Sequence, residues 1–159
     1  MANNYTPEQI ANKFRFIINN LNKIIVTEVM SVANDANAVI AKRVQGTGKN
    51  DAGSDFGTYA YSTQKIKKRK GHDLPPFPHV NFTDTGQMFN DIKPQILKVT
   101  SDSITIRIAP DKTENMTKLE DNVDRFGEIL KLSKQERQDI EDDMNEAVTK
   151  KIVQTFNSY

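Results

Sequence analysis

The N-terminal part of the chain shows a continuous helical pattern of apolar positions that ends near Gln45. Thr6, Pro7 and Gln9 are typical of a helix start, since they supply a capping side chain, a favourable first residue and a capping box. Apolar residues then recur every three or four positions, at Ile10, Phe14, Ile17, Leu21, Ile24, Ile25, Val29, Val32, Ala36 and Ile40. We therefore predict one helix over residues 1–45, on the order of 55 Å long at about 1.5 Å per residue.

A second set of apolar residues lies off this main stripe: Phe16, Ile18, Val26 and Met30. A helix this long exceeds the width of a compact domain of 159 residues, and a second apolar strip on it is typical of contact with another chain. The alternative is that both strips face one core within the chain. The sequence alone leaves these two interpretations open.

Residues 46–86 form a polar connection that contains six of the seven glycines and three of the six prolines. Connections in compact domains are usually about 4 to 6 residues long, so this segment is either a functional arm or a linker. Its apolar and aromatic residues, which a pure linker does not need, are Tyr59, Tyr61, Leu74, Phe77 and Phe82. We predict an extended arm that orders against another subunit through these five residues. The alternation in residues 59–62 indicates a short strand or an extended segment.

The remaining residues alternate between helical and strand patterns. We predict short helices over 87–92 and 116–126, strands over 94–100, 103–108 and 128–132, and a final helix that begins with a second capping box at Ser133.

The final helix carries an apolar stripe that includes Ile140, Met144 and Ile152. We expect this stripe to bury the strand face formed by Ile104, Ile106 and Ile108. The predicted class is α+β: a single domain, 1–159, in which the long N-terminal helix and the C-terminal helix pack on a small antiparallel β-sheet. The long extended arm, 46–86, lies between the first helix and the sheet.

The net charge of +1 conceals an uneven distribution. Residues 42–71 hold eight basic and two acidic residues, for a net charge of +6, and residues 111–146 hold six basic and twelve acidic residues, for a net charge of −6. The basic run consists of Lys65, Lys67, Lys68, Arg69 and Lys70. It has three possible surroundings: DNA phosphate, solvent, or an acidic face on a neighbouring copy that contains Glu120, Asp121, Asp124, Glu141, Asp142 and Asp143.

The sequence shows no constellation of residues typical of catalysis. The absence of cysteine excludes disulfides and thiolate metal sites, and the spacing of His72 and His79 does not fit zinc. The glycines of Gly46-Thr47-Gly48-Lys49 lack the spacing and the preceding strand of a phosphate-binding loop. We therefore predict no catalytic residues, no cofactor and no metal. No run of about 18 apolar residues occurs, so we also expect no membrane span.

Three segments, in their order along the chain, resemble phage tail-completion and head–tail joining proteins, also called virion-morphogenesis or minor tail proteins. These are the long N-terminal helix with its glycine-rich arm, Val80-Asn81-Phe82-Thr83-Asp84-Thr85-Gly86-Gln87-Met88, and Arg125-Phe126-Gly127-Glu128-Ile129-Leu130 followed by Leu132-Ser133-Lys134-Gln135-Glu136. The resemblance implies a structural virion protein without enzymatic activity, assembled in the host cytoplasm.

This resemblance also implies a homo-oligomeric ring, a hexamer or a dodecamer, in the neck or tail-completion region around the DNA channel. Its neighbours would be portal, connector or tail proteins, with possible non-specific contact to genomic DNA. The alternative function is a non-specific nucleic-acid-binding module. In that case the basic run would bind phosphate as point charges, and Tyr59 and Tyr61 would stack on bases.

Overall fold

The computed structural model describes residues 5–71, 80–82, 87–100 and 103–158. In chain order, its elements are α1 (Pro7–Ala41), η1 (Lys42–Thr47), α2 (Tyr61–Arg69), α3 (Gln87–Asp91), β1 (Ile92–Val99), β2 (Ile104–Pro110), α4 (Thr113–Phe126) and α5 (Lys134–Ser158). The two strands form one antiparallel sheet. The predicted α+β class, with a long helix at each end of the chain, is confirmed.

The long N-terminal helix forms as its sequence pattern predicts. Both bonds of the capping box are present: the Gln9 N–H donates to Thr6 Oγ1 (3.2 Å), and the Thr6 N–H donates to Gln9 Oε1 (2.8 Å). Helix α1 continues without a break into η1, a π-helical turn. Gly48 then ends it with a φ of 66°, a left-handed conformation that glycine adopts without steric cost.

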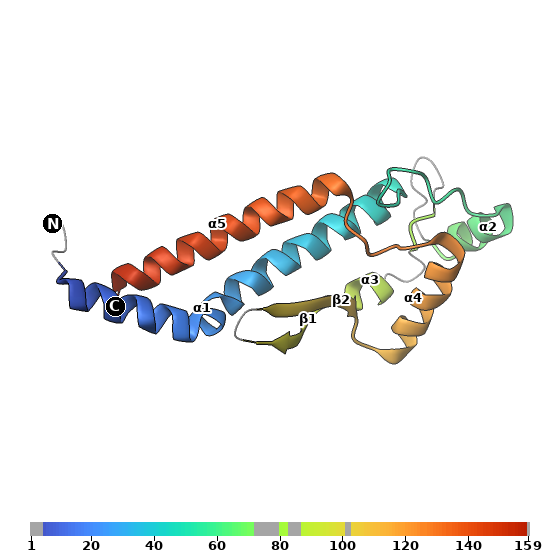
Figure 1. Ribbon diagram of the computed structural model, residues 1–159. Coiled ribbons are helices and arrows are strands. Elements are labelled where there is room, and N and C mark those ends of the chain that lie inside the picture. Colours follow the sequence, from blue (N-terminus) through green and yellow to red (C-terminus); the bar gives the residue numbers. More distant parts are fainter. Residues whose placement is uncertain (1–4, 72–79, 83–86, 101–102, 159) are drawn as a thin grey trace.

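Helix α1 is the middle layer of an elongated molecule, with α5 on one side and the β-hairpin on the other (Figure 1). Toward α5, Lys13 Nζ donates to the Phe156 carbonyl (2.8 Å) and Glu28 pairs with Lys151 (3.1 Å). Toward the hairpin, the side-chain amide of Asn22 donates to the Thr100 carbonyl. Residues 13 and 22 are nine positions apart, which places them on opposite sides of a helix at 3.6 residues per turn.

This layering overturns the expected contact between the last helix and the sheet. Ile104, Ile106 and Ile108 are only partly buried, and the helix that packs on both strands is α1 rather than α5. The stripe that contains Ile140, Met144 and Ile152 lies on α5, which packs along α1. The expectation failed because α1 carries apolar residues on two opposite faces, so it separates the two layers.

The hairpin has the expected pairing, with a local irregularity. Ile96 pairs with Ile106, but Lys98 pairs with Thr105, so β1 contains a bulge between Ile96 and Lys98. On β1, Ile96, Leu97 and Val99 remain 41%, 56% and 49% exposed. One helix therefore covers the apolar side of this sheet incompletely.

The hydrophobic core lies at one end of the molecule, where α1 and η1 meet α3, β1 and α4. It consists of Ile40, Val44, Met88, Phe89, Ile92, Leu119 and Ile129. Ile129 belongs to the segment 128–132, for which we predicted a third strand, and that prediction is wrong. Ile129 is fully buried in the core, and the Lys131 carbonyl accepts a hydrogen bond from Arg43 instead of a strand partner (2.6 Å).

The arm between the first helix and the sheet also differs from the prediction. Residues 61–69 form helix α2 instead of an extended segment or a strand. The lysine, glutamine and arginine residues that fill α2 favour helix, and they outweigh the aromatic alternation at residues 59–62. Leu74 and Phe77 lie outside the described residues.

Candidate functional site

Helix α2 divides the basic run between two faces. Tyr61, Lys65, Lys68 and Arg69 follow a spacing of four, three and one residues, so they share one face of the helix, and all four are exposed. We call this set the basic face. Lys65 Nζ lies 4.8 Å from the centre of the Tyr61 ring, within the range of a cation–π contact.

Lys67 lies on the opposite face of α2 and is only 6% exposed. Its ammonium group lies 4.4 Å from the centre of the Tyr59 ring. The Tyr59 hydroxyl donates to Asn81 Oδ1 (2.9 Å) and accepts from the Asn81 N–H (3.3 Å). Lys67 and Tyr59 therefore help to hold α2 against the rest of the chain. The basic run does not act as a single exposed set of five cations.

Phe82 also has partners within the chain. Its ring packs edge to face against Phe56 (4.9 Å between centres) and against Phe126 of α4 (5.1 Å). The backbone of Phe82 has a φ of 54°, which is uncommon for a bulky residue. Such a conformation costs free energy and persists only where the surrounding contacts enforce it. Of the five residues predicted at a subunit interface, Tyr61 is 72% exposed, whereas Tyr59 and Phe82 are partly buried in the chain. Their contact with a neighbour stays a prediction.

A pocket of about 590 Å³ separates α2 from α4. Its walls include the rings of Tyr59, Phe82 and Phe126, and its basic groups are Lys67, Lys70, Lys118 and Arg125. Its chemistry suits an apolar group that carries negative charge.

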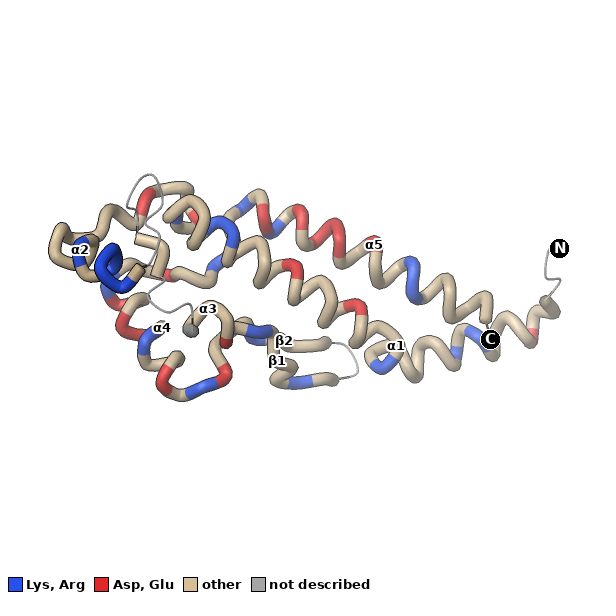
Figure 2. The backbone as a smooth tube through the Cα atoms, turned by 180° about the vertical axis from the view of Figure 1, so that it is seen from behind, with Lys and Arg blue, Asp and Glu red and all other residues tan. Residues whose placement is uncertain are grey.

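The acidic residues of the second half of the chain also divide between two places (Figure 2). Glu120, Asp121 and Asp124 lie on α4, whereas Glu141, Asp142 and Asp143 lie on α5, so the structure does not bring the six predicted acidic residues together. On α5, the residues that share one face by helical spacing are Asp139, Asp142, Asp143 and Glu146, all of them exposed. Asp139 and Glu146 were not predicted from the sequence, although they lie three and four residues from Asp142 and Asp143 and so share their helix face.

A groove of about 700 Å³ runs between α1 and α5 beside these residues. Its acidic residues are Glu28 and Asp35 from α1 and Asp143 and Glu146 from α5, and its basic residues are Lys150 and Lys151. We call it the acidic groove. Lys151 is already paired with Glu28, and the second oxygen of Glu28, Oε2, is buried without a hydrogen-bond partner among the described residues. The groove therefore keeps an excess of negative charge.

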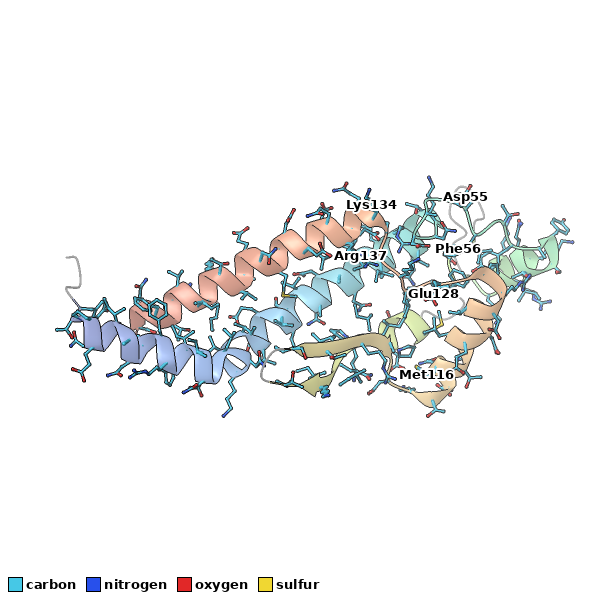
Figure 3. The ribbon with its side chains drawn as sticks, in the orientation of Figure 1. Asp55, Phe56, Met116, Glu128, Lys134 and Arg137 are labelled. Atoms are coloured by element: carbon cyan, nitrogen blue, oxygen red, sulfur yellow. The ribbon has the colours of Figure 1, made fainter. Side chains whose placement is uncertain are left out.

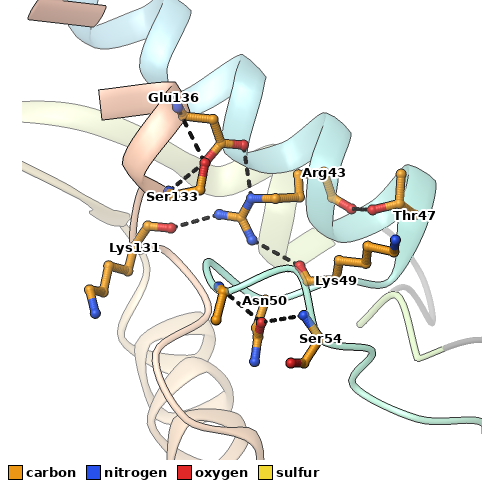
Figure 4. Close-up of polar contacts among 9 residues, drawn as sticks. Arg43, Thr47, Lys49, Asn50, Ser54, Lys131, Ser133 and Glu136 are labelled. Atoms are coloured by element: carbon orange, nitrogen blue, oxygen red, sulfur yellow. Dashed lines mark hydrogen bonds and ion pairs between the residues drawn. The ribbon is translucent and has the colours of Figure 1, made fainter. Parts of the chain in front are cut away.

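Arg43 of η1 fixes this turn against the start of α5 (Figure 4). Its guanidinium group donates to Glu136 Oε1 (2.8 Å) and to the carbonyls of Lys131 (2.6 Å) and Lys49 (2.8 Å). Burial alone would raise the pKa of Glu136, but hydrogen bonds from the Ser133 backbone and from Arg43 outweigh it and lower the pKa. Glu136 and Ser133 also complete the predicted capping box of α5.

Other charged groups at this end of the molecule lie apart from the Arg43 contacts. Figure 3 shows Lys134 and Arg137 on the first turns of α5, Asp55 in the loop after η1, and Glu128 in the segment that leads from α4 to α5. All four are exposed. Within the described ranges, no group of three or more histidine, cysteine, aspartate or glutamate residues could hold a metal ion.

By length and composition, Pro7–Thr47 could cross a membrane: it contains an 18-residue window of mean hydropathy 1.3, of which 28% is buried inside the chain. The core helix of a soluble protein passes the same test, and this helix has α5 on one side and the hairpin on the other. We therefore infer no membrane role from it. Comparison of the chain with protein-family models, with curated proteins and with solved structures finds no match.

Proposed function

We propose that the protein is a non-enzymatic structural subunit of a tailed phage, which assembles with its own copies into a ring in the neck or tail-completion region. One observation carries the proposal: α5 is a helix of 25 residues without a single buried residue. Most of the stability of a protein helix comes from packing an apolar face, and among the described elements α5 packs mainly along α1. A neighbouring subunit would supply further cover.

Uncovered apolar side chains elsewhere support this proposal. Ile10, Phe14 and Ile18 follow one another at four-residue intervals along α1 and are 37%, 52% and 70% exposed. Phe14 has partial cover from Phe156 of α5, whose ring centre lies 5.3 Å away. Ile18 lies one turn before Asn22, on the side of α1 that contacts the hairpin. Ile96, Leu97 and Val99 add exposed apolar surface on β1. Exposed apolar side chains on two neighbouring elements are typical of an interface.

The resemblance of residues 80–88 and 125–136 to phage head–tail joining proteins supports the location in the virion. A ring requires different surfaces on each subunit to meet head to tail. The elongated shape, with the core and α2 at one end and both chain termini at the other (Figure 1), provides two unlike ends. Portal, connector or tail proteins would then lie above and below the ring.

The experiment that tests this function is native mass spectrometry of the purified protein, combined with negative-stain electron microscopy. We expect a single closed oligomer, of six or twelve copies, at low salt and micromolar concentration, and ring-shaped particles. The same sample should be measured with and without double-stranded DNA. A protein that stays monomeric up to hundreds of micromolar, and that leaves phage particles complete when its coding sequence is deleted, would contradict the proposal.

The second candidate function is non-specific nucleic-acid binding. It is favoured by the basic face, which places Lys65, Lys68 and Arg69 next to an exposed tyrosine. Such binding would weaken steeply with salt, because phosphate contacts release counterions. Titration of a fluorescent 30-base-pair duplex at 50 and 200 mM salt tests it: tight, salt-sensitive binding by a monomer would favour this function over the ring.

A further inference from the structure

We propose that the basic face of α2 docks into the acidic groove between α1 and α5 of the next copy of the chain. This inference rests on the proposed ring and names the contact that would build it. It also chooses between the partners that the sequence left open for the basic run.

The basic face lacks charge compensation within the described part of the chain. None of the ion pairs there involves Lys65, Lys68 or Arg69; they join Arg43 to Glu136, Lys93 to Asp111, Lys131 to Asp51 and Lys151 to Glu28. The three side chains project from one side of a short helix, with Tyr61 at its start. The face is thus a compact positive surface that the described ion pairs leave unneutralised.

The acidic groove has the opposite excess. It contains four carboxylates and two ammonium groups, and the pair Glu28–Lys151 removes one of each. Asp35, Asp143 and Glu146 form no ion pair within the described residues, and Lys150 lies one turn beyond Glu146. Asp139 and Asp142 extend the negative charge along α5, where they accept hydrogen bonds from the side-chain amides of Gln135 and Gln138.

The two surfaces match in length. From Tyr61 to Arg69 the basic face spans eight residue steps, about 12 Å of helix, and from Asp139 to Glu146 the acidic stretch spans seven steps, about 10.5 Å. A short helix that lies in a groove between two longer helices is a recurring mode of protein recognition. The three unpaired cations would meet at least three unpaired carboxylates.

The contact must join two molecules. In one chain, α2 lies at the core end, beyond η1, away from the α1–α5 pair (Figure 1). The acidic groove is lined by residues 27–35 of α1 and 143–154 of α5. Two different surfaces of identical chains then form a head-to-tail contact, which closes into a ring if the rotation permits. DNA would neutralise only the basic face, and the acidic groove would then stay uncompensated.

The test is a pair of complementary charge reversals. Variant one carries Lys65→Glu with Lys68→Glu, and variant two carries Asp143→Lys with Glu146→Lys. Each variant alone places like charges on both sides of the contact, so we expect at least tenfold weaker self-association than wild type at 150 mM salt. Mixed in equal amounts, they should form oligomers in which the two variants alternate, because each α2 then meets a groove of opposite charge.

A matched control for variant one carries Lys42→Glu with Lys134→Glu, which makes the same change in net charge at exposed residues outside both surfaces. It should assemble as the wild type does, and circular dichroism should show all three variants folded. Wild-type assembly by either variant alone, or a mixture that fails to assemble, would overturn the proposed contact. Loss of duplex binding by variant one, with its ring intact, would assign the basic face to nucleic acid instead. A wild-type protein that never oligomerises would refute the proposed function itself.

Discussion

The two ends of the molecule are built differently. At the core end, Ile40, Val44 and Ile129 are at most 1% exposed and belong to one apolar cluster. At the other end, the first turns of α1 lie beside the last turns of α5, where Phe14 and Ile18 are 52% and 70% exposed. The core end buries a cluster of apolar residues almost completely. The helical end buries Ile17 (6% exposed) but leaves larger apolar side chains at the surface.

Polar contacts hold the helical end together where packing is thin. Lys13 is 5% exposed, its ammonium group lies 3.7 Å from the centre of the Tyr5 ring, and it donates to the Phe156 carbonyl near the end of α5. A cation near the C-terminus of a helix is favourable, because the last carbonyls lack partners and the helix dipole is negative there. This contact sets the register of α5 on α1 and leaves the outer surfaces of both helices available.

The largest expected effect comes from the core end. Ile40→Ala should lower the free energy of unfolding by about 2 to 5 kcal/mol, because it opens a cavity at a fully buried site. Ile152→Ala on α5 removes the same atoms from a partly exposed site and should cost about 1 kcal/mol or less. Urea denaturation of the monomer measures both. Equal losses would show that the helical end is packed as firmly as the core.

A smaller effect is expected at the boundary between the two ends, where Glu136 binds Arg43 and Ser133. Glu136→Gln should lower stability at neutral pH by about 1.5 to 3 kcal/mol, the usual worth of hydrogen bonds to a charged group. The folded pKa of Glu136 is lowered, so its contribution is complete above the unfolded pKa of about 4.3 and is lost as the pH falls through the folded value.

Thermal melts between pH 7 and pH 3 measure this dependence. The wild type should lose stability on acidification more steeply than Glu136→Gln, which has no carboxyl group to protonate at this position. Glu128→Gln is the matched control, since Glu128 is an exposed carboxylate in the segment just before α5 (Figure 3). An identical acid profile for wild type and Glu136→Gln would show that this carboxylate does not join the two ends.

Local signals predicted the helices at both ends of the chain. The capping boxes at Thr6 and Ser133 need only neighbours three residues away, and both form. The hairpin was also predictable, because its alternation and its turn are close in sequence.

Features that depend on distant partners were not predictable in the same way. Arg43 contacts the Lys131 carbonyl and Glu136 across 88 and 93 residues, and no local pattern marks it. The apolar residues of the segment 128–132 favoured a strand, but in the structure Ile129 lies in the core, with Leu130 and Leu132 packed against it. Helix α1 has two apolar faces, and α5 packs on one while the β-hairpin packs on the other. The spacing of apolar residues along α1 does not show which face takes which partner.

The smallest effect on stability is expected at Ile18, one helical turn before the residue that contacts the hairpin. Ile18→Ser removes a side chain that is 70% exposed, so the free energy of unfolding should change by no more than about 0.5 kcal/mol. If a neighbouring subunit covers this face of α1, the same variant should nevertheless weaken oligomer formation, because interface anchors bury apolar area only in the assembly.

The control is Asn19→Ser, a change at the adjacent exposed residue, which should alter neither stability nor oligomer formation. Native mass spectrometry and urea denaturation on the same samples separate the two effects. A loss of stability above about 1 kcal/mol in the monomer would mean that Ile18 is packed within its own chain. Normal stability with normal assembly would instead place the subunit contact on other surfaces, leaving this end of α1 simply exposed.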